Sequence, residues 1–173
     1  MRSAKTWIMA DVETSGPVYG RHSLLEIGAA FGSREAGVTD LYEALVAPIS
    51  DEALTSRAAF ERAKERGLPP AEAMRKFWEW CAPKVALGAE LVARPAAFDW
   101  PWIVHYAWTY LGQNPFGFKA VCASAWMQAL GKRFPVRLSH VAVQDAETQL
   151  RHFLKRAARS PRAWTSFEPL TFA

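Results

Sequence analysis

Hydrophobic and polar positions divide the chain into a strand-rich first part and a part in which strands and helices alternate. Apolar runs of β-favouring residues predict strands near residues 5–12, 23–32 and 40–47, and GSREAG supplies a turn between the last two. The later pattern predicts, in order, helices within 51–66 and 70–82, a strand at 86–93, a helix after Asp99, a short strand near 118–122, a helix to about 130 and a terminal helix from about 144 to 158.

This order of elements predicts an α/β protein with a mixed five-stranded sheet and helices on both faces. Three strands in succession favour antiparallel pairing, whereas strands that alternate with helices pair in parallel. A chain of 173 residues, half of them apolar, suits one domain with a sizeable core. We assign residues 1–160 to this domain and residues 161–173 to a C-terminal extension.

The first candidate functional segment is MADVETSG, where an apolar strand ends in alternating acids. Side chains two residues apart share a face of a strand, so the carboxylates of Asp11 and Glu13 would emerge together. Buried carboxylates are costly unless a cation relieves their charge, which makes this pair a candidate metal site. The alternative is that Asp11 caps a turn and Glu13 is solvated.

The second segment, ARPAAFDWPWIVHYAWTYLG, places an acid on the apolar side of a helix. The helix is expected to begin near Ala97 and to hold Pro101 in its first turn, where a missing N–H donor is tolerated. Asp99 then shares a side with Trp102, Ile103, Tyr106 and Tyr110. It is either a metal ligand or a first-turn acid that complements the helix dipole.

The third segment, SHVAVQDAETQLRHFLKR, combines a histidine with an acid in the first turn of the terminal helix. His140 precedes Asp145 by five residues, so a bend between them would bring imidazole and carboxylate to one site. A single histidine is more often an ordinary core or surface residue. The functional interpretation therefore depends on all three segments together.

The segments DVETSG, AAFD and HVAVQDA resemble, in order and approximate spacing, the three motifs of the DEDDh family of 3′-to-5′ exonucleases. LLEIGAA resembles the second strand of that family, so the resemblance covers roughly residues 5 to 155. His140 marks the histidine subgroup, because the tyrosine subgroup would place tyrosine where Val141 stands. The middle motif departs from the family pattern at Arg94 and Pro95.

The resemblance implies a ribonuclease H-like exonuclease fold and a hydrolase that uses two divalent cations, Mg²⁺ or Mn²⁺. It implies that Asp11, Glu13 and Asp145 hold one cation, that Asp11 bridges to the second, and that Asp99 supports the second. His140 would be the general base. Thr14 would contact the terminal nucleotide. The implied substrate is a single-stranded 3′ end, from which nucleoside 5′-monophosphates are released one at a time.

Basic residues gather around the third segment, although the formal net charge is only +4. They are Lys132, Arg133, Arg137, Arg151, Lys155, Arg156, Arg159 and Arg162. Such residues either offset the repulsion between an acidic cluster and a polyanionic strand or form a solvated helix face. We assign contacts with substrate phosphates to Arg151, Lys155 and Arg156.

Several questions stay open at the level of sequence. A nuclease-like module that binds nucleic acid without cutting it is the main alternative, and DNA and RNA are not distinguished, because no residue identifies a contact to the 2′-hydroxyl. A homodimer is also an open alternative. No window is apolar enough to span a bilayer and no secretory signal is present, so a cytoplasmic protein with no membrane partner is expected. Cys81 and Cys122 are interpreted as structural.

Overall fold

The chain folds into the series of strands and helices that its sequence predicts. The computed structural model describes residues 4–134 and 137–157. In chain order the elements are β1 (Thr6–Thr14), β2 (Leu24–Ser33), β3 (Gly37–Leu45), α1 (Arg57–Arg66), α2 (Pro70–Ala86), β4 (Glu90–Ala93), α3 (Ala96–Leu111), β5 (Val121–Cys122), α4 (Ala123–Ala129) and α5 (Ala142–Ala157). The predicted extension at 161–173 lies outside the described residues.

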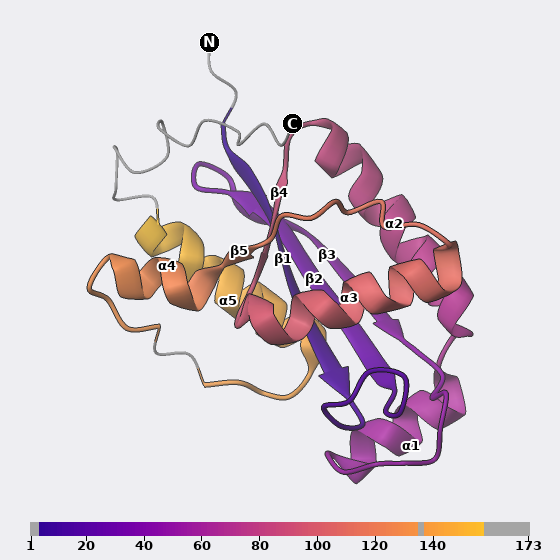
Figure 1. Ribbon diagram of the computed structural model, residues 1–173. Helices are drawn as coiled ribbons and strands as arrows, with labels where there is room; N and C mark the ends of the chain where they lie inside the picture. Colours follow the sequence, from indigo (N-terminus) through magenta and orange to yellow (C-terminus); the bar gives the residue numbers. More distant parts are fainter. Residues whose placement is uncertain (1–3, 135–136, 158–173) are drawn as a thin grey trace, which may run out of the picture.

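The strands form one mixed sheet in the order β3-β2-β1-β4-β5 (Figure 1). The pairs β1/β2 and β2/β3 are antiparallel, whereas β1/β4 and β4/β5 are parallel. This is the predicted division between an opening meander and later crossover units. It makes β1 the central strand, and the end of β1 from Asp11 to Thr14 extends past the last residue of β4 while it stays paired with β2.

Successive side chains of β1 point alternately into two hydrophobic layers, one on each face of the sheet. Ile8, Ala10 and Val12 pack against α2 and α3, while Trp7 and Met9 pack against α5 and the start of α4. The ribbon shows these helix pairs on opposite faces of the sheet (Figure 1). Asp11 and Glu13 continue the odd-numbered series, so they face α5.

Several element boundaries differ from the prediction. Helix α2 continues through Pro83 to Ala86, so the following strand begins at Glu90 and not near residue 86. Helix α3 begins at Ala96, which makes Pro101 its sixth residue. The expectation that Pro101 lies in the first turn is therefore wrong, and the helix loses one internal hydrogen bond there.

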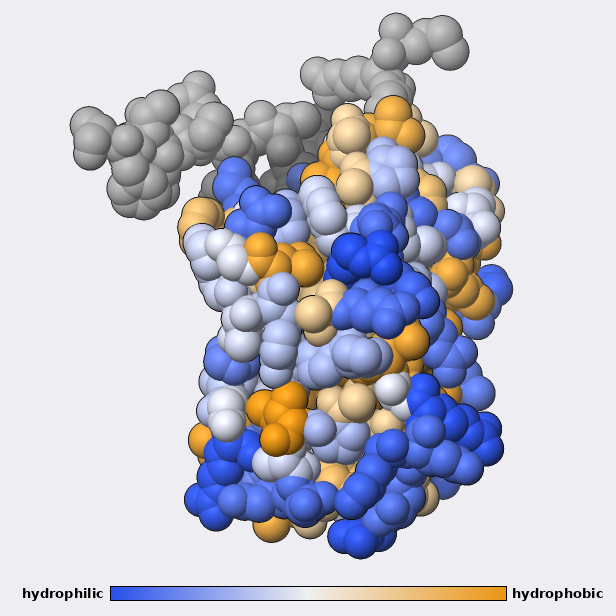
Figure 2. Space-filling view, turned by 90° about the vertical axis from the view of Figure 1, so that its right-hand side faces the viewer, coloured by the Kyte–Doolittle hydropathy of each residue, from blue (hydrophilic) through white to orange (hydrophobic). Residues whose placement is uncertain are grey.

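The surface is mostly hydrophilic on the side that Figure 2 presents, with hydrophobic side chains in small separate groups. Large exposed apolar residues are spread along the chain, among them Trp108 on α3 and Leu54, Leu87 and Phe118 in loops. Scattered apolar side chains of this kind are normal for a protein surface. Among the helices that the structure describes, none is long and apolar enough to cross a membrane.

Candidate active site

Acidic side chains from β1 and α5 meet at the C-terminal end of β1. Asp11, Glu13 and Asp145 each place one carboxylate oxygen so that the three oxygens lie within 4.8 Å of one another. Asp11 and Asp145 are buried, and Glu13 is partly exposed. The structure thus brings together two of the three sequence segments that supplied candidate acids.

The first turn of α5 sits directly on β2 because Gly28 leaves room for it. A Cβ atom at Gly28 would lie 2.1 Å from the carbonyl carbon of Ala142. Two residues earlier on the same face, the buried Glu26 accepts a hydrogen bond from the Ala142 N–H at 3.4 Å. The close approach of Ala142 to Gly28 and its hydrogen bond to Glu26 together fix where α5 begins, and therefore where Asp145 lies.

Asp145 also organises the segment that carries the histidine. It accepts hydrogen bonds from the N–H and Oγ of Ser139, at 2.7 and 2.8 Å, and from the N–H of His140 at 2.9 Å. His140 adopts a left-handed backbone with φ of 60°. This bend directs the imidazole to the acids, with Nδ1 3.8 Å from Oε1 of Glu13, while the side chain stays 75% exposed.

Asp99 reaches the same place from the first turn of α3. Its Oδ1 accepts the N–H of Val12 at 3.3 Å, which links α3 to β1 between the two acids of that strand. The side chain is buried, and its Oδ2 has no hydrogen-bond partner. A buried, unpartnered carboxylate oxygen next to other acids is an available ligand atom for a cation.

Gln149 is a site residue that the sequence analysis did not assign. It lies one turn after Asp145 on α5, and its Nε2 donates to Oδ1 of Asp11 at 2.8 Å. It is fully buried, and its Oε1 has no partner. Its spacing of four residues from Asp145 was the available signal, because such residues share a helix face.

Burial and mutual repulsion make the acids reluctant to ionise. Burial, followed by the charge of Asp99, raises the pKa of Asp11 to about 8. Burial raises the pKa of Asp99 to about 7, against hydrogen bonds that favour the ionised form. Burial also raises the pKa of Glu13, while the nearby His140 lowers it. A cluster with these properties is stabilised by an added positive charge.

The donor set fits a hard divalent cation. The candidate ligand atoms are carboxylate oxygens, which suit Mg²⁺ or Mn²⁺, and neither cysteine belongs to the cluster. The unpartnered oxygen of Asp99 and the raised pKa values of Asp11 and Asp99 agree with this fit. The cluster is consistent with a metal site.

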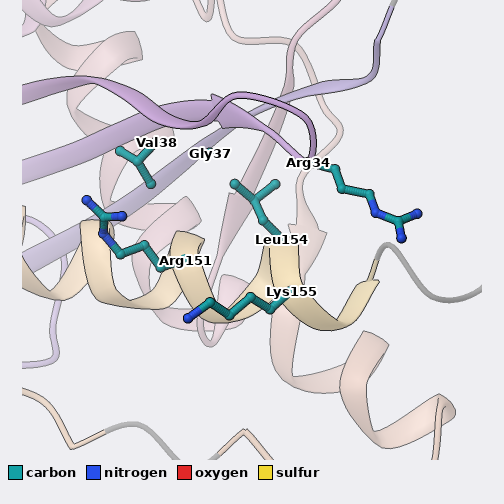
Figure 3. A pocket seen from close by; sticks show the side chains of 6 residues that line it. All are labelled: Arg34, Gly37, Val38, Arg151, Leu154 and Lys155. Atoms are coloured by element: carbon teal, nitrogen blue, oxygen red, sulfur yellow. The ribbon is translucent and has the colours of Figure 1, made fainter.

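The residues predicted to contact substrate lie at different distances from the cluster. Thr14 is buried at the end of β1, and its carbonyl accepts a hydrogen bond from the Thr55 hydroxyl. Arg151 and Lys155 lie further along α5, where with Arg34 they line a cavity of about 300 Å³ (Figure 3). Arg156 does not line this cavity, and its Nη1 donates a hydrogen bond to the carbonyl of Arg133 at 3.2 Å.

The atypical Arg94 has a structural role. Its Nη2 donates to the Phe134 carbonyl at 3.2 Å, and its guanidinium carbon lies 4.7 Å from the centre of the Phe134 ring. These contacts join the end of β4 to the segment that follows α4. Of the other predicted basic residues, Arg159 and Arg162 lie outside the described part of the chain.

Comparisons with known proteins agree with the fold and the site. The chain is 35% identical to the 3′-5′ DNA exonuclease Cap18 of Escherichia coli over 129 residues, which cover 70% of this chain and 67% of Cap18. No profile of a known protein family matches the sequence. The relationship to Cap18 and the agreement in fold and motifs place the chain in the DEDDh family of 3′-to-5′ exonucleases.

Solved structures share the fold at low sequence identity. The nuclease domain of 3′hExo, a DEDDh family member bound to rAMP, has a TM-score of 0.65 at 13% identity, covering 91% of this chain and 94% of that domain. The zinc-bound form of the E. coli ExoI–ssDNA complex has a TM-score of 0.62 at 15% identity, covering 92% of this chain and 42% of ExoI. The predicted ribonuclease H-like exonuclease fold is confirmed.

Proposed function

We propose that this 3′-to-5′ exonuclease hydrolyses single-stranded DNA in a reaction that depends on two divalent cations and releases nucleoside 5′-monophosphates. The observation that carries the proposal is the meeting of Asp11, Glu13 and Asp145 within 4.8 Å, with Asp99 joined to the intervening residue of β1. Cap18 is a DNA exonuclease, and the ExoI structure contains single-stranded DNA, which favours DNA over RNA.

In this proposal the acids divide between two cations. Asp11, Glu13 and Asp145 would hold one, and Asp11 with Asp99 would hold the other. Bound cations would neutralise charge on the phosphoryl oxygens and lower the pKa of a water molecule. Gln149 orients Asp11 through its hydrogen bond at 2.8 Å, as partners of metal ligands commonly do.

His140 supplies the base. Its imidazole lies beside Glu13 at the exposed side of the cluster, so it can accept a proton from the attacking water and pass it to solvent. A histidine is suited to this role because a neutral imidazole has a free ring nitrogen that can accept a proton. The expected polarity follows from the family, since a free 3′ end is the substrate of its members.

The test compares linear strands of DNA and RNA, labelled at the 3′ or the 5′ end, with Mn²⁺ or with chelator. We expect metal-dependent release of labelled mononucleotides from the 3′ end before any loss of the 5′ label, with DNA cleaved faster than RNA. A closed circular strand should resist. Asp11→Asn, purified in the same way, controls for contaminating nucleases.

Each part of the proposal can fail separately in this assay. Cleavage of the circle would indicate an endonuclease. Faster cleavage of RNA than of DNA would contradict the proposal that DNA is the substrate. Binding of strands without cleavage under any metal would support the alternative of a nuclease-like binding module.

A further inference from the structure

Helix α1 places an arginine beside the acid cluster, and the proposed reaction as described above does not use it. Arg62 donates from Nη2 to Oε1 of Glu26 at 2.5 Å. Glu26 pairs directly with Glu13 across β1 and β2, so both side chains lie on the face that α5 covers. Directly paired residues of antiparallel strands have Cβ atoms about 5 Å apart. The guanidinium of Arg62 therefore contacts the residue that is paired with Glu13, a candidate metal ligand.

The ion pair between Arg62 and Glu26 is asymmetric. The side chain of Glu26 is 4% exposed, whereas that of Arg62 is 45% exposed. Arginine carries five N–H donors in a rigid planar fork that matches phosphate oxygens. Because Glu26 anchors one side of the fork and nearly half of the side chain meets solvent, Arg62 can present further donors outward while its position is fixed.

The charge of Arg62 also acts on the site. Burial raises the pKa of Glu13, and the charges of His140 and, less strongly, of Arg62 oppose that rise. The basic residues of α5 lie further away, since the first of them, Arg151, is six residues beyond Asp145, about 9 Å along the helix axis, and pairs with Glu147. A polyanionic strand that approaches four carboxylates needs a nearby positive group to offset repulsion.

We propose that Arg62, anchored by the buried Glu26, binds the phosphate group that sits at the acid cluster. The ligand class is the scissile phosphodiester of the strand and the 5′-phosphate of the released nucleotide. This inference rests on the proposed function, because it identifies a substrate contact of the same site. Arg62 acts as a binding residue and takes no part in proton transfer.

The test measures how much a phosphate contributes to binding. Dissociation constants for thymidine 5′-monophosphate and for thymidine are measured with the full chain in Mn²⁺. We expect the wild type to prefer the monophosphate, and Arg62→Gln to reduce that preference by about tenfold or more, the usual effect of losing a charge-assisted hydrogen bond. The affinity for thymidine and the affinity for Mn²⁺ alone should stay within about twofold of the wild type.

Two further variants separate phosphate binding from a structural role. Arg62→Lys keeps a positive partner for Glu26 and should retain part of the preference. Arg57→Gln, on the same helix, removes an exposed arginine that pairs with Glu61 at 2.8 Å and should leave the preference unchanged. The inference is overturned if Arg62→Gln keeps the wild-type preference, or if it weakens Mn²⁺ and thymidine binding as much as monophosphate binding.

Failure of the proposed function is recognised independently of these measurements. It would appear as a wild-type protein that does not degrade labelled strands. A wild type that degrades strands but shows no preference for the monophosphate would overturn the assignment of Arg62 alone.

Discussion

At the scale of single residues, the site combines acids that resist ionisation with one exposed histidine. Asp11 and Asp99 are buried and close to each other, so the folded protein holds their protons to a higher pH than an unfolded chain would. Gln149 is the neutral hydrogen-bond donor to Asp11. The consequence is that the same burial that prepares the acids for a cation destabilises the protein when no cation is bound.

The metal-free protein should become less stable as the pH rises. The folded-state pKa of Asp11, about 8, exceeds the ordinary value of 3.8, so between these values the folded state binds more protons than the unfolded state. The free energy of unfolding therefore falls with increasing pH in this window. Thermal melts in chelator from pH 5 to pH 8 should show the decrease.

Asp11→Asn should make that profile less steep and raise the melting temperature at pH 8, by about 2–4 °C for each kcal/mol recovered. Mn²⁺ should stabilise the wild type at pH 8 and have much less effect on the variant. Asp51→Asn, at a surface side chain that is 88% exposed, is the matched control and should follow the wild type. A melting temperature that rises with pH in chelator would contradict the role of these buried acids.

Replacing His140 should slow the reaction without removing metal affinity. Loss of a general base typically lowers turnover by about 10²–10⁴-fold, and the acid limb of the pH–rate profile should flatten. Because residue 140 has φ of 60°, His140→Asn is the better variant, since asparagine tolerates the left-handed backbone better than alanine does. An unchanged pH profile, or loss of Mn²⁺ binding, would remove His140 from the role of base.

At the scale of elements, the position of α5 on β2 decides whether the site exists. Gly28 admits the backbone of Ala142 and Val143, and Glu26 accepts the N–H of Ala142. The sequence predicted the strand and the helix, including the bend before Asp145, from patterns within about twenty residues. It did not predict their contact, because Glu26 and Ala142 are 116 residues apart and nothing local relates them.

Gly28→Ala should damage both stability and catalysis. The added methyl group would overlap the first turn of α5, which costs about 1–3 kcal/mol and displaces Asp145 relative to β1. A displacement of about 1 Å can cost 10²-fold in turnover. Melting temperature and single-turnover rate on a labelled strand measure the two effects.

Gly32→Ala is the control for that variant. A Cβ atom there would lie 2.1 Å from the carbonyl oxygen of Gly37, the first residue of β3, at the opposite end of β2 from the acid cluster. It should lower stability to a similar degree while the rate of the remaining folded protein stays near that of the wild type. Equal losses of rate in the two variants would show that the slower reaction of Gly28→Ala does not result from displacement of α5.

At the scale of the whole molecule, acidic and basic regions are separated along α5. The acid cluster lies at its N-terminal end, and Arg151 and Lys155 line the cavity with Arg34 towards its C-terminal end. The sequence predicted the fold class, the sheet pairing and the candidate acids. It did not separate Arg156 from Arg151 and Lys155, because the direction of a long side chain depends on tertiary neighbours, here the carbonyl of Arg133.

The basic residues of α5 should contribute to binding through salt-dependent phosphate contacts. Replacing Arg151, Lys155 and Arg156 by glutamine should reduce the slope of log affinity against log salt by about 1.4, since each contact with a single strand accounts for about 0.7 and Arg156 is held by the carbonyl of Arg133. Turnover at saturating strand should change little. Binding is measured without metal across a salt titration.

The same number of charges removed from α1 and α2 gives the control. Arg57, Arg66 and Arg75 lie on α1 and α2 and form ion pairs with exposed glutamates. Their replacement by glutamine should leave the slope unchanged. Equal slopes for both triple variants and the wild type would mean that the basic side of α5 is only a solvated helix face.

The hydrogen bond between Gln149 and Asp11 spans 138 residues, and this has a consequence for biosynthesis. The first two acids leave the ribosome early, but their partners on α5 are translated only after every other element of the sheet. A nascent chain in which α5 has not yet been translated therefore contains the central strand but lacks Asp145 and Gln149. Because domains fold as units once their sequence has emerged, the nuclease acquires its active site only after α5 has been synthesised.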